Sequence, residues 1–173
     1  MKAIVLIGLP GAGKTTFGIA LARRRGLDFI DTDQAIERSS GRTVAQIFQV
    51  GGEPHFRALE REIVAPLALK EDIVISLGGG GFEDGETRRA LLAHCLVVWL
   101  DPPYELLLAR LRASPPRPLF ANRHHGRVLA GLAAARRATH AQAHLRVTET
   151  KLGPAIAAIE AFLPANEDRR CGR

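Results

Sequence analysis

The segment between Gly8 and Thr15 constrains the fold of this chain more than any other, because it reads G-L-P-G-A-G-K-T. The apolar residues 2–8 lead into it and are typical of a buried strand, and a helix is predicted from Lys14 to about Arg25. Glycines between a strand and a helix let the backbone wrap closely, so that successive N–H groups point at phosphate oxygens. We therefore predict a phosphate-binding loop inside a strand–loop–helix unit.

The two residues that end this motif indicate a nucleoside triphosphate. Lys14 can reach the β- and γ-phosphates, and the hydroxyl of Thr15 can bind Mg²⁺. A tight glycine turn that only caps a helix would explain the glycines, but not a lysine and a threonine at this spacing. The predicted nucleotide-binding residues of the motif are Gly11, Ala12, Gly13, Lys14, Thr15 and Thr16. The motif does not identify the acceptor of the phosphate.

The rest of the chain alternates apolar strands with helices. Further strands are predicted at residues 28–31, 72–77, 95–100 and 144–150. Helices are predicted at 34–41, 44–50, 53–69, 86–94, 103–112, 127–143 and 154–163. Near-continuous apolar strands that alternate with helices indicate a parallel sheet covered on both faces. We predict an α/β three-layer sandwich with a five-stranded parallel sheet, which binds ligands at the carboxyl ends of its strands.

Composition excludes several other classes of protein. With 173 residues, 46% of them hydrophobic, the chain can bury a core as one domain, which we expect over residues 1–164 with a frayed tail at 165–173. No apolar run is long enough to span a membrane, and the first one leads into the glycine motif rather than a signal-peptide cleavage site. The two cysteines do not indicate a disulfide framework, so we expect a reducing cytoplasm.

The net charge of +6 points to anionic ligands. Only four of the 24 basic residues are lysines, and arginine offers a planar fork that matches phosphate and carboxylate. The arginines form no long stripe with interleaved aromatic residues, as a nucleic-acid-binding surface would. We therefore predict small anionic substrates, with no nucleic acid and no membrane as partner.

Four further motifs, in their order and spacing, resemble those of the shikimate kinase family. They are F-I-D-T-D at 29–33, G-E-P-H-F-R-A-L-E at 52–60, G-G-G at 78–80 and R-P-L at 117–119. The resemblance runs from about residue 4 to about residue 163. It implies a P-loop fold of the nucleoside-monophosphate-kinase type with a lid, and transfer of the γ-phosphate of Mg-ATP to the 3-hydroxyl of shikimate. The products would be ADP and shikimate 3-phosphate, in the route to chorismate and the aromatic amino acids, and we expect a cytoplasmic monomer.

The resemblance implies distinct roles for the two acids that follow the second strand. Asp31 would hold Mg²⁺ with Thr15, directly or through water, as carboxylates near a phosphate-bound metal do. Asp33 would accept hydrogen bonds from the substrate hydroxyls and would orient or deprotonate the attacking one. The alternative for either acid is a cap on the helix that starts near Gln34.

Recognition of shikimate would fall to the helices at about residues 32–61 and to the glycine triplet. Arg57 would bind the carboxylate by charge-assisted hydrogen bonds, with Glu60 holding Arg57 in place. An exposed ion pair of little energetic value is the alternative for these two residues. Phe48 and Phe56 would line the pocket unless they are simply core. Gly78, Gly79 and Gly80 would bring backbone N–H groups to the ring, and a flexible turn is their alternative.

The resemblance also implies a lid at about residues 113–126. Arg117 would come from the lid and neutralise charge on the transferring phosphoryl group. Arg110 would stack on the adenine, or else lie solvated on a helix face. Pro154 would form the other side of the adenine site, or simply begin the last helix.

The chain departs from the family at the second carboxylate-binding arginine. The family pattern resembles R-x-P-x-Y, whereas residues 136–140 read R-R-A-T-H, so that the proline and the tyrosine are both absent. The register from the following strand favours Arg136 over its neighbour Arg137. This departure is the only support for a catalytically weak, nucleotide-binding paralogue with a regulatory role. Another small-molecule kinase of the same fold, such as a gluconate kinase, is the nearest alternative enzyme.

Overall fold

The five apolar segments form one sheet in which every pairing is parallel. This computed structural model describes residues 1–114, 120 and 124–163. The strands are β1 (Ile4–Ile7), β2 (Asp28–Asp31), β3 (Ile73–Ser76), β4 (Leu96–Leu100) and β5 (Leu145–Val147). Their order across the sheet is β2-β3-β1-β4-β5, with β1 at the centre. The predicted five-stranded parallel sheet is therefore confirmed.

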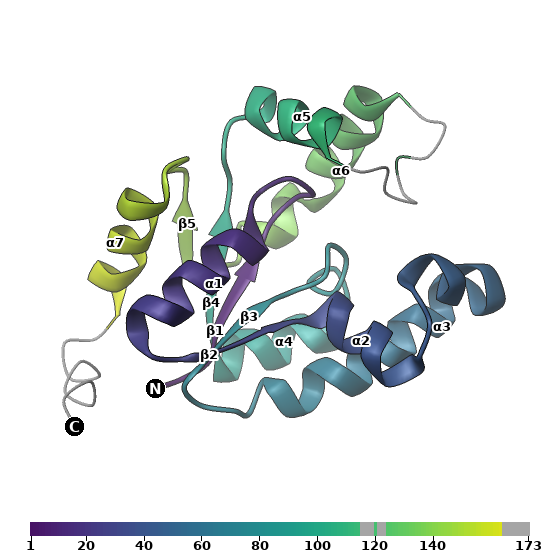
Figure 1. Cartoon of the computed structure of the whole chain (residues 1–173), viewed down its shortest axis with the longest axis horizontal. Coiled ribbons are helices and arrows are strands. Elements are labelled where there is room, and N and C mark those ends of the chain that lie inside the picture. The colour runs from purple at the N-terminus through teal and green to yellow at the C-terminus, as the bar shows by residue number, and fades with distance from the viewer. Residues whose placement is uncertain (115–119, 121–123, 164–173) are drawn as a thin grey trace.

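Seven helices are present among the described residues, and six of them pack on the two faces of this sheet, while the helix that starts at Thr32 packs on the helix that follows it (Figure 1). They are α1 (Lys14–Arg25), α2 (Thr32–Ser40), α3 (Val44–Leu67), α4 (Gly85–His94), α5 (Tyr104–Ala113), α6 (His125–His140) and α7 (Leu152–Phe162). Side chains of a strand alternate between its faces. Ile4 and Leu6 accordingly join a buried cluster with α1, α5, α6 and α7, whereas Val5 and Ile7 join one with α3 and α4. The predicted three-layer sandwich is thus confirmed.

The observed helix boundaries differ from the predicted ones by up to three residues, and two regions bear on the site. The helices expected at 44–50 and 53–69 are the two arms of α3, which is interrupted at Gly52, where φ is 66° and ψ is −170°. A left-handed glycine followed by Pro54 ends a helical hydrogen-bond ladder, so the predicted break is present in the backbone. Helix α2 begins at Thr32, before the expected start near Gln34, because the side chain of Asp31 caps it.

The carboxyl ends of β1, β2 and β3 lie level with one another. The register pairs Asp31 with Ser76, and Ser76 with Leu6, so the loops that follow these strands leave the same edge of the sheet. This edge carries the glycine motif, the two acids and the glycine triplet. Most of the predicted lid and the whole predicted tail lie outside the described residues. In the described part of the chain, no helix is both long enough and apolar enough to span a membrane.

Candidate active site

The loop after β1 is built as a phosphate-binding loop. Gly13 is the N-cap of α1 and holds a left-handed φ of 94°, which a residue with a side chain adopts only at a cost. Lys14 opens the helix, and its Nζ donates to the carbonyl oxygen of Gly8 at 3.0 Å, so the lysine side chain folds back over the loop. Gly11 and Ala12 lie within the loop, and Thr16 is exposed in the first turn of α1. The free N–H groups and the dipole of a helix N-terminus favour an anion at this place.

Asp31 connects this loop to α2 through both of its carboxylate oxygens. Its Oδ2 accepts a hydrogen bond of 2.8 Å from Oγ1 of Thr15. Its Oδ1 accepts from the backbone N–H of Asp33 at 3.1 Å and of Gln34 at 3.4 Å. The helix cap that the sequence left as an alternative for Asp31 is therefore real, and it occupies one oxygen while the other faces the phosphate loop. Asp33 lies in the first turn of α2 and is not the cap.

The turn after β3 is packed so closely that side chains would not fit at Gly78 or Gly80. A Cβ at Gly78 would overlap Oδ1 of Asp33, and a Cβ at Gly80 would overlap the guanidinium of Arg57. At Gly79 the nearest side-chain atom to a Cβ would be Nη1 of Arg136, at 3.5 Å. The glycine triplet therefore brings together one carboxylate from α2, one guanidinium from α3 and one from α6.

One predicted contact of this turn is corrected by the structure. The backbone N–H of Gly78 was expected to face the substrate, but it donates to Oγ1 of Thr32 at 2.8 Å. Thr32 is completely buried, so its hydroxyl stabilises the turn and does not contact a ligand. Sequence reasoning missed Thr32, although its place between the two acids of F-I-D-T-D was a signal for it.

Arg57 is held by two glutamates of its own helix. Its Nη1 donates to Oε2 of Glu60 at 2.5 Å, and its Nη2 donates to Oε1 of Glu53 at 3.1 Å. Glu60 is only 2% exposed, so the alternative of an exposed ion pair is wrong for this residue. Burial raises the pKa of Glu60, and the adjacent Arg57 opposes that effect. Burial alone would lower the pKa of Arg57, but the two carboxylates more than compensate and keep it charged.

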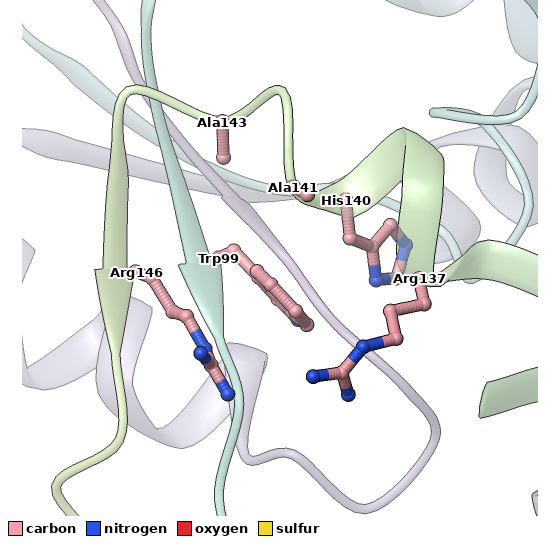
Figure 2. A pocket seen from close by; sticks show the side chains of 6 residues that line it. All are labelled: Trp99, Arg137, His140, Ala141, Ala143 and Arg146. Atoms are coloured by element: carbon pink, nitrogen blue, oxygen red, sulfur yellow. The ribbon is translucent and has the colours of Figure 1, made fainter. Parts of the chain in front are cut away.

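Arg136 and Arg137 point to different places, although they are neighbours on α6. Arg136 is half-buried beside Gly79, and its Nη1 is buried with no hydrogen-bond partner among the described residues. Arg137 is exposed and lines a separate pocket together with Trp99, His140 and Arg146 (Figure 2). Within that pocket Arg146 is ion-paired with Asp101 and lies over the Trp99 ring. Of the two candidates, it is Arg136 that faces the glycine turn.

The adenine-binding candidates have different surroundings. Nη1 of Arg110 on α5 donates to the carbonyl oxygens of Gly11 at 3.1 Å and Ala12 at 3.4 Å. Arg110 therefore packs on the phosphate loop and is not a solvated residue of a helix face. Pro154 is exposed in the first turn of α7. Arg117 lies outside the described residues.

The two predicted pocket phenylalanines form a stacked pair. The rings of Phe48 and Phe56 are 4.8 Å apart at 28°. Phe56 is buried and packs with Ile36 and Ile47, so its core alternative is correct, while its ring also lies 5.4 Å from the Arg57 guanidinium carbon. Phe48 is 37% exposed and remains available to a ligand.

Replacing Gly80 by alanine is expected to displace Arg57 from its position over the turn. The added methyl would overlap the guanidinium, and a charged group held by two glutamates has little room to move. We expect the affinity for the anionic acceptor to fall by about 5- to 150-fold, which corresponds to roughly 1–3 kcal/mol for the overpacked site. Gly131→Ala on α6, where a Cβ meets no atom within 4 Å, is the matched control and should bind normally. Equal acceptor affinity in the two variants would contradict this account.

Comparisons with known proteins show which family the chain is similar to. The family model described as shikimate kinase matches residues 10–165. A shikimate kinase of Caulobacter vibrioides (strain NA1000 / CB15N) is 40% identical over 95% of this chain and 82% of the relative. A shikimate kinase of Symbiobacterium thermophilum is 46% identical over 83% of this chain and 84% of the relative.

Solved structures show the same likeness. A shikimate kinase from Acinetobacter baumannii in complex with shikimate superposes with a TM-score of 0.85 at 32% identity, covering 99% of this chain and 96% of that chain. A gluconokinase from Sinorhizobium meliloti 1021 reaches a TM-score of 0.56 at 17% identity, covering 92% of this chain and 90% of that chain. The second likeness shows the fold alone.

Proposed function

The chain belongs to the shikimate kinase family, and on this premise we propose how its residues transfer the γ-phosphoryl group of ATP to the 3-hydroxyl of shikimate. It is an ATP-dependent phosphotransferase, and its products are ADP and shikimate 3-phosphate. One observation carries the assignment of the acceptor site. Asp33, Arg57 and Arg136 converge on a turn without side chains, next to the phosphate loop. Two cations and an acid suit a small molecule that bears one carboxylate and several hydroxyl groups.

The nucleotide half of the site rests on the loop after β1. The N–H groups of this loop and the ammonium of Lys14 bind the phosphates in our proposal. The adenine lies between Arg110 and Pro154, which is supported for Arg110 by its contact with the loop carbonyls. Arg117 neutralises charge on the transferring group, and it comes from the segment predicted as the lid.

The residues beside the phosphate loop fit a magnesium ion. Mg²⁺ prefers hard oxygen ligands and is commonly held by one or two carboxylates together with substrate phosphates. The Thr15 hydroxyl and the Asp31 carboxylate offer such oxygens side by side. The described residues contain no group of three or more His, Cys, Asp or Glu that could hold an ion without the nucleotide. When bound with ATP, the ion supplies neutralisation of phosphate charge.

Two substitutions of Asp31 are expected to separate its role as a cap from its role toward the metal. Asn is as good an N-cap as Asp, so Asp31→Asn should leave the free energy of unfolding close to that of the wild type. Asp31→Ala should lower it by about 1 kcal/mol. Both variants should need a higher Mg²⁺ concentration for half-maximal turnover, because both lack the carboxylate charge. Thermal unfolding without metal measures the first effect, and a Mg²⁺ titration of turnover measures the second. An unchanged Mg²⁺ requirement in Asp31→Asn would contradict the metal role and would show that Asp31 acts only as a helix cap.

The acceptor half binds and orients shikimate. Arg57 and Arg136 bind the carboxylate, with Glu60 holding Arg57, while Phe48 and the glycine turn border the ring and the buried Phe56 supports Phe48 from behind. Asp33 accepts the hydrogen of the attacking hydroxyl, either by orienting it or by taking the proton. Phosphoryl transfer requires mainly positioning and charge neutralisation, which these residues provide together. Closure of the lid would exclude water and limit the hydrolysis of ATP.

A coupled ADP-release assay tests this function directly. Mg-ATP is supplied with shikimate, gluconate, AMP or no acceptor, each at the same concentration. We expect strong ADP release with shikimate and background release in the other three reactions. Background release in all four, with measurable ATP binding, would instead favour a nucleotide-binding protein without kinase activity. A single domain over residues 1–164, a monomeric state and a cytoplasmic location remain predictions.

A further inference from the structure

A side-chain hydrogen bond between Thr139 and Glu83 joins the end of α6 to the glycine turn. Thr139 stands between Ala138 and His140, which replace the proline and the tyrosine of R-x-P-x-Y, at a position where that pattern specifies no residue. Its Oγ1 lies 2.7 Å and 2.9 Å from the two carboxylate oxygens of Glu83. Glu83 follows the glycines, and its backbone N–H donates to the carbonyl oxygen of Gly80 at 3.0 Å. One side-chain contact therefore joins the last turn of α6 to the loop that borders the acceptor site.

The hydroxyl of Thr139 lies within hydrogen-bond distance of two acceptor groups, the Glu83 carboxylate and the carbonyl oxygen of Arg136. The same Oγ1 lies 2.9 Å from the carbonyl oxygen of Arg136 within the helix. A hydroxyl donates only one proton, and a carboxylate is a stronger acceptor than a neutral carbonyl. We therefore assign the donated hydrogen bond to Glu83. In this arrangement the hydroxyl links α6 to the segment after the glycine turn, and does not only bond within its own helix.

His140 fixes the same helix end by packing. It is only 3% exposed, with its ring edge-on to Trp99 at 5.7 Å and tilted against Phe82 at 6.2 Å. Figure 2 shows its ring beside the Trp99 ring, with Arg137 reaching out three residues earlier on α6. Burial is the main cause that lowers the pKa of His140 to about 4, so the imidazole is neutral near pH 7. Although its Nε2 lies 3.6 Å from Oε1 of Glu83, it does not neutralise that carboxylate.

The charged side chain of Arg136 is disfavoured by its surroundings, so the helix turn that carries it has to be held in place. Burial tends to lower the pKa of Arg136, and Arg57 adds like-charge repulsion across the site. Of the carboxylates that offset these effects, Glu83 has the strongest influence. Like charges in a half-buried site move apart unless the elements that carry them are held. The element that carries Arg136 is the turn of α6 that Thr139 and His140 hold.

We propose that Thr139 and Glu83 are positioning residues for Arg136, and that their hydrogen bond holds the last turn of α6 so that the guanidinium faces the substrate carboxylate beside Gly79. This inference rests on the proposed function, because it concerns the affinity for shikimate. Neither residue touches the substrate in this account. Their effect therefore passes through Arg136, and it should appear in the KM for shikimate and not in the chemical step.

Replacing Thr139 by valine tests the hydrogen bond at nearly constant shape. We expect the KM for shikimate to rise about five- to thirtyfold, with kcat and the KM for ATP within about twofold of the wild type. Thr139→Ser restores the hydroxyl and should recover most of the affinity. The exposed Thr148→Val is the matched control and should leave all three constants unchanged. An unchanged KM for shikimate in Thr139→Val, or no recovery in Thr139→Ser, would overturn the proposal.

A double-mutant cycle tests whether the two residues act as one unit. Glu83→Leu should raise the KM for shikimate at least as much as Thr139→Val does, because it also removes the carboxylate charge that acts on Arg136, and the double variant should be no worse than Glu83→Leu alone. Additive effects would mean that the two side chains act separately, which contradicts the proposal. The side chain of Glu83 is 31% exposed, so this substitution also serves if the valine variant does not fold. Failure of the proposed function itself would already appear as background ADP release by the wild type, before any variant is compared.

Discussion

Replacing Asp33 by asparagine is expected to lower kcat with shikimate by about 10²- to 10⁴-fold, which is the usual loss when a catalytic base is removed. Asparagine keeps the shape and can still accept a hydrogen bond, but it cannot take a proton. Asp33 lies in the first turn of α2 with Oδ1 directed at Gly78, on the acceptor side of the phosphate loop. The KM for ATP should therefore stay close to that of the wild type.

The size of the loss distinguishes the two roles open to Asp33. If the carboxylate only orients the hydroxyl, asparagine replaces one hydrogen bond by another, and kcat should fall by about tenfold or less. Steady-state kinetics with shikimate and ATP varied separately give both constants. Asp28→Asn, at the exposed start of β2, is the matched control for the change of charge. A raised KM for ATP with normal kcat in Asp33→Asn would contradict its assignment to the acceptor.

Replacing Arg136 by alanine is expected to raise the KM for shikimate by about 10²-fold. Truncating one partner of a buried, charge-assisted pair costs about 2–5 kcal/mol, and each 1.4 kcal/mol corresponds to a factor of ten. The orphaned Nη1 of Arg136 beside Gly79 is the atom whose pairing the carboxylate would complete. The nucleotide constants should change little, because the described contacts of Arg136 lie on the acceptor side.

Arg137→Ala provides a matched control on the next residue of the same helix. Arg137 is exposed and lines the pocket with Trp99, so its loss should leave the KM for shikimate within about twofold of the wild type. Isothermal titration of shikimate into each variant would check the kinetic result by direct binding. Equal losses in the two variants would show that charge on this helix matters only in general, and would remove the specific role of Arg136.

The elements of the fold could be predicted because their signals are local. The apolar runs that become β1 and β3 are buried at every residue, as strands covered on both faces should be. The start and end of α1 were predicted because glycines flank it on both sides. The break at Gly52 was predicted from the same kind of signal, and the two helices predicted on either side of it are the two arms of α3.

The site was predicted less completely, because its contacts join residues far apart in the sequence. Motif spacing identified Arg57, and the register of the following strand favoured Arg136, but their shared approach to the glycine turn became visible only in three dimensions. The dual use of Asp31 could not be chosen from the sequence, where the cap and the phosphate-loop contact were alternatives. The contact between Thr139 and Glu83 joins residues 56 positions apart and follows no periodic pattern. No feature of the sequence alone pointed to it.

The position of β1 at the middle of the sheet has a consequence for the order in which substrates arrive. The acceptor residues come from α2, α3, α6 and the turn after β3, whereas the adenine candidates Arg110 and Pro154 come from α5 and α7. The two sets share no helix, and β1 with its loop lies between β3 and β4. Neither ligand therefore has to build the binding surface of the other. We expect either ATP or shikimate to bind first to the empty enzyme. Catalysis then requires the ternary complex but no fixed order of binding.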